Sequence, residues 1–359
     1  MNYNDTLHQA WQAHLAAKSP HAPTVISTFA GCGGSSLGYS MAGFRELLAV
    51  EWDEHAVRTF KKNFPHVPVY HGDIAKLPVE QCLNTAGIGV GELEVFDGSP
   101  PCQSFSTAGK RSFTDMRGQL FKEYVRLLRG LNPKVFVMEN VSGMVKGKMK
   151  LIFAEILREL KGCGYEVAVR LLNASHYGVP QARERIIFIG VRNDLGIPPS
   201  HPLGHFAPIT VKEALGDCAP SEIVPLTGKN LAKMQLLRPG ANAKEKERAS
   251  IAVFGKVSGF TLLRLKWHAP SPTILKTVSV SPTFGAGLVM PDENRYVSIS
   301  ELKRLGSFPD QFQLEGTFEE RWARIGNSVP PLLMRAIAQH IKTEILARVS
   351  FDQNIRRAA

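Results

Sequence analysis

The chain has few cysteines, and their spacing indicates neither a disulfide framework nor a zinc site. Its 359 residues include five, at positions 32, 82, 102, 163 and 218. None of them forms a Cys-x-x-Cys pair, and their odd number does not suit a set of disulfides. The sequence also lacks any stretch of about eighteen apolar residues and any basic-then-apolar segment at its start. We therefore expect a protein of the reducing cytoplasm, without a metal centre or a membrane span.

Acidic residues are outnumbered by basic ones. Asp and Glu number 32 against 43 Lys and Arg, which gives a formal net charge of +11. This excess favours a polyanionic partner and predicts binding that weakens with salt. Ribosomal and membrane-surface proteins are basic as well, so the charge supports nucleic-acid binding without identifying it. The length and the 44% of hydrophobic residues suffice for one large domain plus a smaller one.

Short apolar runs alternate with helical patterns in the first half of the chain, which predicts an α/β domain with a parallel sheet. We expect strands at 25–29, 47–50, 67–70, 94–97, 135–138 and 186–191. The carboxyl ends of parallel strands meet at one edge of a sheet, where ligands bind. Residues that directly follow these runs are therefore the candidates for a site.

A glycine cluster at 31–34 follows the first predicted strand. Residues without a Cβ let backbone N–H groups and a helix N-terminus approach a ligand. A plain tight turn would look the same, but Glu51 and Asp73 end the next two predicted strands, and Trp52 adds an aromatic face. Carboxylates at such positions accept hydrogen bonds from ribose hydroxyls. Together the three strand ends predict a nucleoside-binding edge.

Cys102 follows two prolines at the end of the fourth predicted strand. Pro100 and Pro101 fix two φ angles and have no N–H, so the thiol stands on a stiff turn. A lone cysteine is often only a small buried hydrophobe. Here Glu139 and Asn140 end the following predicted strand and would reach the same edge of the sheet. A thiol beside a carboxyl group suits sulfur addition to C6 of a pyrimidine whose ring nitrogen the carboxyl group contacts.

Eight motifs in register resemble the DNA (cytosine-5) methyltransferase family, over roughly residues 24–341. They include Phe-Ala-Gly-Cys-Gly-Gly at 29–34 and Ser-Pro-Pro-Cys-Gln-Ser-Phe-Ser at 99–106. The others lie at 51–52, 73–74, 138–141, 181–185, 308–310 and 326–331. Ser99 stands where many relatives have glycine, and Cys32 where they vary, but neither is a reacting group.

The resemblance implies an α/β fold with two domains. The first is a Rossmann-like S-adenosylmethionine-dependent methyltransferase domain with a mostly parallel central sheet, and the second is a smaller, irregular, largely β target-recognition domain. We expect residues 1–192 and 323–359 to form the catalytic and cofactor-binding domain, and residues 193–322 the target-recognition domain with its hinge. Short segments bounded by Gly, Ser and Pro at 253–289 predict irregular antiparallel strands there.

Three segments outside the predicted sheet have helical patterns. Leu7, Ala10, Trp11, His14 and Leu15 recur at helical spacing, so we expect a short amphipathic helix packed on the main domain. Further helices are predicted at 300–305 and 332–346.

By the same resemblance, the catalytic residues are Cys102, Glu139, Arg183 and Arg185. Cys102 would add to C6 of cytosine, and Glu139 would contact N3 and the exocyclic amine. Arg185 would bind O2, and Arg183 would steady the Cys102 loop or a phosphate. No metal is implied. The cofactor S-adenosylmethionine would contact Phe29, Gly31, Cys32, Gly33, Gly34, Glu51, Trp52, Asp73, Ile74, Pro100, Leu120, Asn327 and Ser328.

Double-stranded DNA is the implied partner. The target cytosine would rotate out of the helix, because C6 of a stacked base is closed to attack. The segment 103–118 would close over it, with DNA contacts from Gln103, Ser106, Lys110, Arg111 and Arg117. Further candidates in the second domain are Lys229, Lys233, Arg238, Lys244, Lys246, Arg248, Lys256, Arg264, Lys266 and Lys276. We expect a monomer associated with the nucleoid and a cognate restriction endonuclease as a functional partner.

Three alternatives stay open from the sequence. Thymidylate synthases also direct a Pro-Pro-Cys thiol at pyrimidine C6, but they do not need the glycine cluster. tRNA cytosine-5 methyltransferases share nearly all the motifs and carry Cys-Phe-Thr where this chain has Gly259, Phe260 and Thr261. A catalytically inactive DNA-binding subunit would keep the fold, although intact Cys102 and Glu139 argue against it.

Overall fold

The structure is a computed structural model that describes residues 2–101, 116–145, 150–204, 207–257, 262–283 and 285–349, without the side chains of residues 116–118 and 145. The chain divides into two compact units. The sheet unit comprises Ala13–Asn173, Glu184–Gly204 and Leu333–Ala359. The second unit comprises Met1–Gln12, Ala174–Arg183 and His205–Leu332. Both units are therefore discontinuous in sequence.

A seven-stranded sheet forms the centre of the sheet unit, in the order β3-β2-β1-β4-β5-β8-β6. Its strands are β1 (Thr24–Thr28), β2 (Arg45–Glu51), β3 (Val69–His71), β4 (Val95–Gly98), β5 (Val135–Val141), β6 (Tyr165–Asn173) and β8 (Glu184–Arg192). The first five pair in parallel, whereas β8 runs antiparallel to both β5 and β6. The predicted mostly parallel sheet is confirmed. Its strand order reverses between β1 and β4, the place where such sheets bind ligands.

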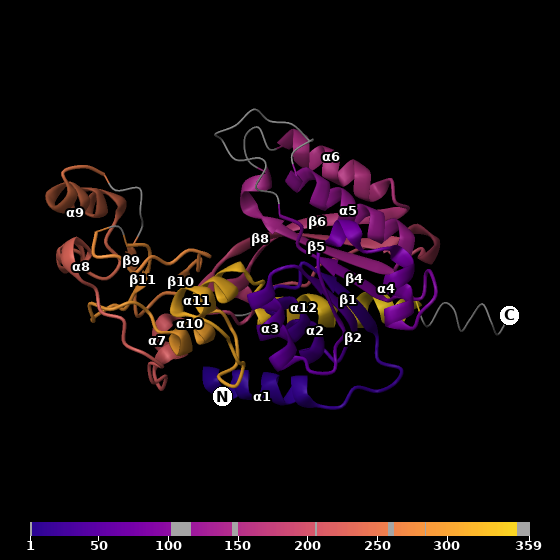
Figure 1. Cartoon of the computed structure of the whole chain (residues 1–359), viewed down its shortest axis with the longest axis horizontal. Helices are drawn as coiled ribbons and strands as arrows, with labels where there is room; N and C mark the ends of the chain where they lie inside the picture. The colour runs from indigo at the N-terminus through magenta and orange to yellow at the C-terminus, as the bar shows by residue number, and fades with distance from the viewer. Residues whose placement is uncertain are drawn as a thin grey trace. The chain divides into compact units, whose positions relative to one another are not determined.

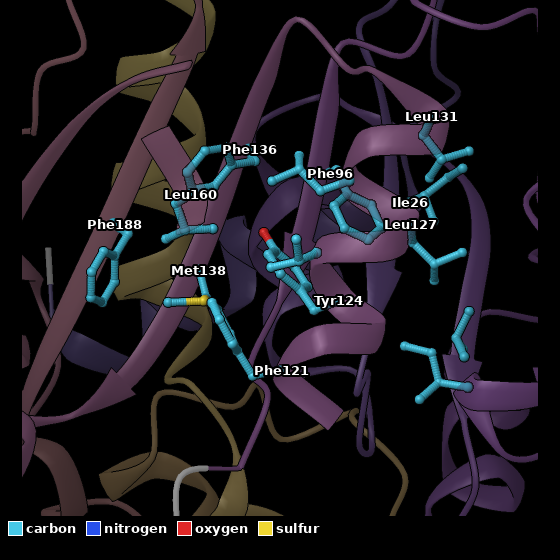
Figure 2. Close-up of a cluster of buried hydrophobic side chains, with 14 of the residues drawn as sticks. Ile26, Phe96, Phe121, Tyr124, Leu127, Leu131, Phe136, Met138, Leu160 and Phe188 are labelled. Atoms are coloured by element: carbon cyan, nitrogen blue, oxygen red, sulfur yellow. The ribbon is translucent and has the colours of Figure 1, made fainter. Parts of the chain in front are cut away.

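Helices cover both faces of this sheet (Figure 1). They are α2 (Gly34–Met41), α3 (Glu54–Asn63), α4 (Val79–Ala86), α5 (Met116–Leu131), α6 (Lys150–Lys161) and α12 (Pro331–His340), with single turns at Ile74–Lys76, Ser142–Val145 and Asn193–Leu195. On one face, α5 and α6 pack against Phe96, Phe136 and Phe188 of the strands, and Tyr124 of α5 stacks on Phe96 (Figure 2). Aromatic residues bury large apolar areas, so this cluster contributes much of the unit's stability.

The predicted terminal helices are confirmed, with two differences. Helix α1 (Tyr3–Leu15) has its first turns in the second unit, where the Tyr3 hydroxyl donates to the carbonyl of Arg304 at 3.0 Å. Only its end lies in the sheet unit, where His14 contacts Ser40 Oγ at 2.9 Å. Helix α12 continues as a π-helix over Ile341–Leu346, which the apolar periodicity did not indicate.

The second unit is richer in helix than predicted. Its helices are α7 (Val211–Leu215), α8 (Gly228–Gln235), α9 (Ala243–Phe254), α10 (Ile299–Leu305) and α11 (Phe318–Asn327), with a single turn at Ala174–Tyr177. Its strands β7 (Gln181–Ala182), β9 (Leu262–Arg264), β10 (Ser271–Pro272) and β11 (Gly287–Val289) have only two or three residues each. They pair in parallel, as β10 with β7 and β11 with β9, and antiparallel pairing is confined to isolated bridges such as Ser279 with Ala286. Among the described residues, the predicted largely β, antiparallel composition is therefore wrong.

The physical reason is visible at the start of α9. The Asn242 side chain accepts from the N–H of Glu245 at 3.0 Å, and the Glu245 carboxylate accepts from the N–H of Asn242 at 2.6 Å. This capping box satisfies amide donors that the first helical turn leaves free. The charged stretch 244–248 that follows consists of good helix formers.

A half-buried arginine, Arg264, holds several loops of the second unit together. The Arg264 guanidinium donates to the carbonyls of Met290, Pro291 and Glu293 and, from its other nitrogen, to that of Met234 at 2.9 Å. A guanidinium engaged by so many carbonyls stabilises the fold and has little capacity left for a phosphate. Of the candidates for DNA contact, Arg264 thus has a structural role in the described contacts, and Lys233 is only 6% exposed.

No helix within the described ranges is both long and apolar enough to span a bilayer. Within the same ranges, no group of three or more His, Cys, Asp and Glu side chains is arranged to hold a metal ion.

Candidate active site

The first strand end of the sheet unit is a tight glycine turn (residues 29–34) between β1 and α2. Gly31 and Gly33 have φ angles of 58° and 97°. A Cβ on Gly33 would lie 2.4 Å from Cε2 of Phe64, so only glycine fits. Phe29 also has a positive φ, 55°, which costs a non-glycine residue about 1–2 kcal/mol. Strain of this kind is typical of binding sites.

Glu51, at the end of β2, organises this turn. One carboxylate oxygen accepts from the N–H of Gly31 at 2.7 Å, and the other accepts from the N–H groups of Trp52 and Asp53 at 2.8 and 2.9 Å. Three amide donors hold the carboxylate in one orientation. Since its two oxygens have about four acceptor positions, one stays available for a hydroxyl group.

The other predicted nucleoside contacts differ in exposure. The Trp52 side chain is 78% exposed, which suits an aromatic platform. Asp73 is exposed and caps the turn Ile74–Lys76 by accepting from the N–H of Ala75 at 3.0 Å. Ile74 and Cys32 are buried, so Cys32 presents its backbone rather than its thiol. Leu120 of α5 is partly buried and packs on the core cluster.

A side-chain hydrogen bond connects the segment after β4, which leads to Cys102, to strand β5. Pro100 is buried, and its carbonyl accepts from Nδ2 of Asn140 at 3.2 Å. Asn140 lies near the end of β5, the parallel neighbour of β4. The approach to Cys102 is therefore fixed up to Pro101, the last residue before a segment outside the described residues.

Glu139 and Arg185 form a buried ion pair beside this strand end. Nε of Arg185 lies 2.6 Å from Oε1 of Glu139, and each side chain is 12% exposed. The antiparallel register pairs Val141 with Arg185, which puts Glu139 and Arg185 diagonally opposite on one face. The two side chains therefore form a close ion pair at this strand end.

Arg183 is placed differently from Arg185, although one residue separates them. It is 3% exposed and belongs to the second unit, where it donates to the carbonyls of Ile274 at 2.9 Å and Gly326 at 3.0 Å. Gln181 also contacts this segment by accepting from the N–H of Ile274. The predicted contact of Arg183 with the Cys102 loop or a phosphate stays a prediction.

The remaining predicted residues lie at the end of α11 or outside the residues that the structure describes. Asn327 is the exposed last residue of that helix, and Ser328 caps it through a bond from its hydroxyl to the carbonyl of Arg324 at 2.7 Å. Cys102, Gln103, Ser106, Lys110 and Arg111 lie outside the described residues, as does the side chain of Arg117. Their roles stay predictions.

Two buried carboxyl groups near the glycine turn were not predicted. Glu46 of β2 accepts from the Ser36 hydroxyl at 2.9 Å. Asp97 of β4 is 3% exposed and accepts from the Tyr39 hydroxyl at 3.3 Å. Burial raises the pKa of Glu46 to about 7, and burial with the nearby Glu46 charge raises the pKa of Asp97 well above its usual range. The sequence signal for such a buried carboxyl group was an acidic residue inside an apolar run, as in Val-Phe-Asp-Gly at 95–98.

Glu46 makes stability depend on pH. The folded protein keeps this proton up to about pH 7, whereas an unperturbed glutamate releases it near 4.5. The contribution is therefore complete below pH 4.5, falls as the pH rises through 7 and is absent above, with a size of about 3 kcal/mol. Glu46→Gln keeps an acceptor for Ser36 and should remove this dependence.

Urea unfolding of both proteins at about pH 5 and about pH 8 measures it. The wild type should lose stability relative to the variant at the higher pH. A difference between the two proteins that does not change with pH would contradict the prediction.

The sheet topology, the glycine turn and the acidic strand ends define the class of Rossmann-like, S-adenosylmethionine-dependent methyltransferases. The model of the family C-5 cytosine-specific DNA methylase matches residues 23–343. The Type II methyltransferase M1.HphI of Haemophilus parahaemolyticus is 34% identical over 332 residues, covering 89% of this chain and 86% of the relative. M.XorII of Xanthomonas oryzae pv. oryzae is 33% identical over 360 residues, covering 89% and 84%.

A solved structure described as a DNA modification methyltransferase encoded within an E. coli prophage superimposes with a TM-score of 0.70 at 26% identity, covering 90% of this chain and 99% of that one. The chain belongs to the C-5 cytosine-specific DNA methylase family. It is a DNA (cytosine-5) methyltransferase that uses S-adenosylmethionine and acts on DNA. The predicted family, the Rossmann-like fold with its mostly parallel sheet, the activity and the cofactor are confirmed, and the match favours DNA over the tRNA alternative.

Proposed function

We propose that the methyl group goes to C5 of a cytosine rotated out of the DNA duplex, through a covalent bond between Sγ of Cys102 and C6. The supporting observation is the buried Glu139–Arg185 pair at the end of β5. Strand β4 is the parallel neighbour of β5 and leads through Pro100 to Cys102. A base held by that pair would therefore lie beside the thiol.

Glu139 and Arg185 would contact different atoms of the cytosine ring. Arg185 would donate to O2, with its guanidinium held in place by the Glu139 carboxylate. Glu139 would contact the exocyclic amine and, in its protonated form, give a proton to N3 as the Cys102 thiolate adds to C6, which leaves C5 nucleophilic. After methyl transfer, loss of the C5 proton to solvent, expulsion of the Cys102 thiolate and return of the N3 proton to Glu139 would restore the aromatic ring.

The residues of the glycine turn fit S-adenosylmethionine, which supplies an electrophilic methyl group on a sulfonium. Gly31 and Gly33 expose backbone N–H groups where a side chain would interfere. Glu51 has an acceptor position for a ribose hydroxyl, and exposed Trp52 has a free face for adenine. The same proposal includes contacts from Phe29, Asn327 and Ser328 and from the residues at 32, 34, 73, 74, 100 and 120.

DNA recognition would involve the segment 103–118 and the second domain. We assign target recognition and the hinge to 193–322, and catalysis to 1–192 with 323–359. The relatives named Type II methyltransferases support a defined target sequence and a cognate restriction endonuclease. We also propose that the protein is a cytoplasmic monomer associated with the nucleoid.

Sequencing of treated DNA tests the proposed function. DNA incubated with the protein and S-adenosylmethionine, then deaminated chemically, should show protected cytosines within one short recurring sequence. The control is the same DNA without the methyl donor. Protection scattered without a common sequence would contradict specific recognition, and no protection at all would contradict methylation of duplex DNA.

A further inference from the structure

Asp97 lies where the two halves of the active site approach one another within the sheet unit. It is the third residue of β4, which lies between β1 and β5, and it pairs in register with Ser27 and Val137. Three residues later comes Pro100, the start of the turn that carries Cys102. The Asp97 carbonyl accepts from Oγ1 of Thr28 at 3.1 Å, so its backbone is fixed to the strand that enters the glycine turn.

The packing at this point is tight. A Cβ on the next residue, Gly98, would lie 2.4 Å from Oγ1 of Thr28 and 2.6 Å from Cε2 of Tyr124. Such close approach leaves the end of β4 no room to shift. A side chain anchored at Asp97 is therefore held on a rigid support.

The Asp97 side chain contacts helix α2, which begins at the glycine turn. Its Oδ1 accepts from the Tyr39 hydroxyl at 3.3 Å, and it also bonds to the hydroxyl of Ser35 in the first turn of the helix. These contacts connect helix α2 to strand β4, which lies next to β1 in the sheet. No other part of the proposed mechanism uses this carboxyl group.

We propose that Asp97 is a positioning residue for methyl transfer, because its carboxyl group fixes helix α2, and with it the glycine turn, against the strand that leads to Cys102. Methyl transfer needs the donor carbon and the acceptor base held in one geometry, and a small misplacement slows such a reaction strongly. Because Asp97 is only 3% exposed, it acts through the turn and the strand.

The surroundings of Asp97 require a neutral group. Tyr39 and Ser35 face it from α2, Glu46 from β2, Glu139 from β5 and Tyr124 from α5, and none of them is a cation. A buried carboxylate without a countercharge is costly, whereas a protonated one can both donate and accept. Asparagine has the same shape and the same two capacities, so it should replace Asp97.

The test compares Asp97→Asn with Asp97→Ala. We measure S-adenosylmethionine affinity by calorimetry, DNA affinity by titration and the rate of a single turnover. Asp97→Ala should weaken cofactor binding and slow transfer by roughly tenfold or more each, while DNA affinity stays unchanged. Asp97→Asn should stay within about threefold of the wild type in all three.

Tyr39→Phe keeps the test valid if Asp97→Ala does not fold, because it removes only one hydroxyl. It should weaken cofactor binding by about threefold or more. The matched control is Tyr124→Phe, which loses a buried bond to the Val137 carbonyl at 3.1 Å but none to α2. Unchanged cofactor affinity and rate in Asp97→Ala, equal damage in Asp97→Asn, or equal effects of the two tyrosine variants would overturn the proposal. Cofactor affinity is measured without DNA, so this result is independent of the proposed target recognition.

Discussion

Replacement of Cys102 by alanine is expected to abolish methyl transfer while DNA binding survives. Only the sulfur is proposed to add to C6, and without that addition C5 of the aromatic ring is a poor nucleophile. A loss of about 10⁴-fold or more is expected, because no other group replaces a missing nucleophile. Transfer of a labelled methyl group and a gel-shift titration with the same DNA measure the two properties.

Cys163→Ala is the matched control for this variant. Cys163 is partly buried after α6, where its thiol donates to the Glu159 carbonyl at 3.2 Å. Its removal should change the rate by no more than a factor of about two. DNA carrying 5-fluorocytosine should become covalently attached to the wild type and to Cys163→Ala, but not to Cys102→Ala. Equal methyl transfer by the two alanine variants would end the covalent mechanism.

Glu139→Gln is expected to slow methyl transfer by about a hundredfold or more, the usual contribution of a positioned acid or base. The amide keeps the shape of the side chain but can neither give nor take a proton at N3. It also leaves the buried Arg185 cation without the carboxylate that lies 2.6 Å away. Single-turnover rates, compared with thermal unfolding and DNA affinity, separate a chemical effect from an effect on folding.

Glu159→Gln provides the comparison at the surface of the same unit. The Glu159 carboxylate also pairs with an arginine, Arg129 at 3.2 Å, but the two side chains are 43% and 55% exposed. Exposed pairs contribute little, so this variant should keep wild-type turnover. Wild-type turnover in Glu139→Gln would instead remove Glu139 from its proposed role.

The central strands of the sheet could be predicted from the sequence because they are buried on both faces, whereas the half-exposed edge strand β6 was not predicted. The apolar runs at 25–29, 94–97 and 135–138 are nearly continuous and end in Gly, Pro or acidic residues, as expected for strands of a parallel sheet. Such runs give the strand ends, and strand ends give the candidate site. Glu51 and Glu139 were found in this way.

The partners of these residues could not be predicted, because register and burial depend on contacts far apart in sequence. The contact of Glu139 with Arg185 follows from the antiparallel register of β5 and β8, which no local pattern specifies. Arg183 and Arg185 lie two positions apart in the sequence, yet Arg183 is buried among backbone carbonyls of the second unit, whereas Arg185 belongs to the sheet unit. Asp97 was counted as the end of an apolar run, since its pairing with Tyr39 depends on how α2 packs.

The left-handed backbone of Phe29 has a consequence for efforts to make this enzyme more heat-resistant. A library selected only for survival on heating would favour glycine or asparagine at that position, since either relieves the strained φ of 55°. The same replacement would delete the aromatic ring from the cofactor turn. Laboratory evolution of this protein therefore has to score catalysis in every round, or the first gains will remove a side chain that we propose to contact the cofactor.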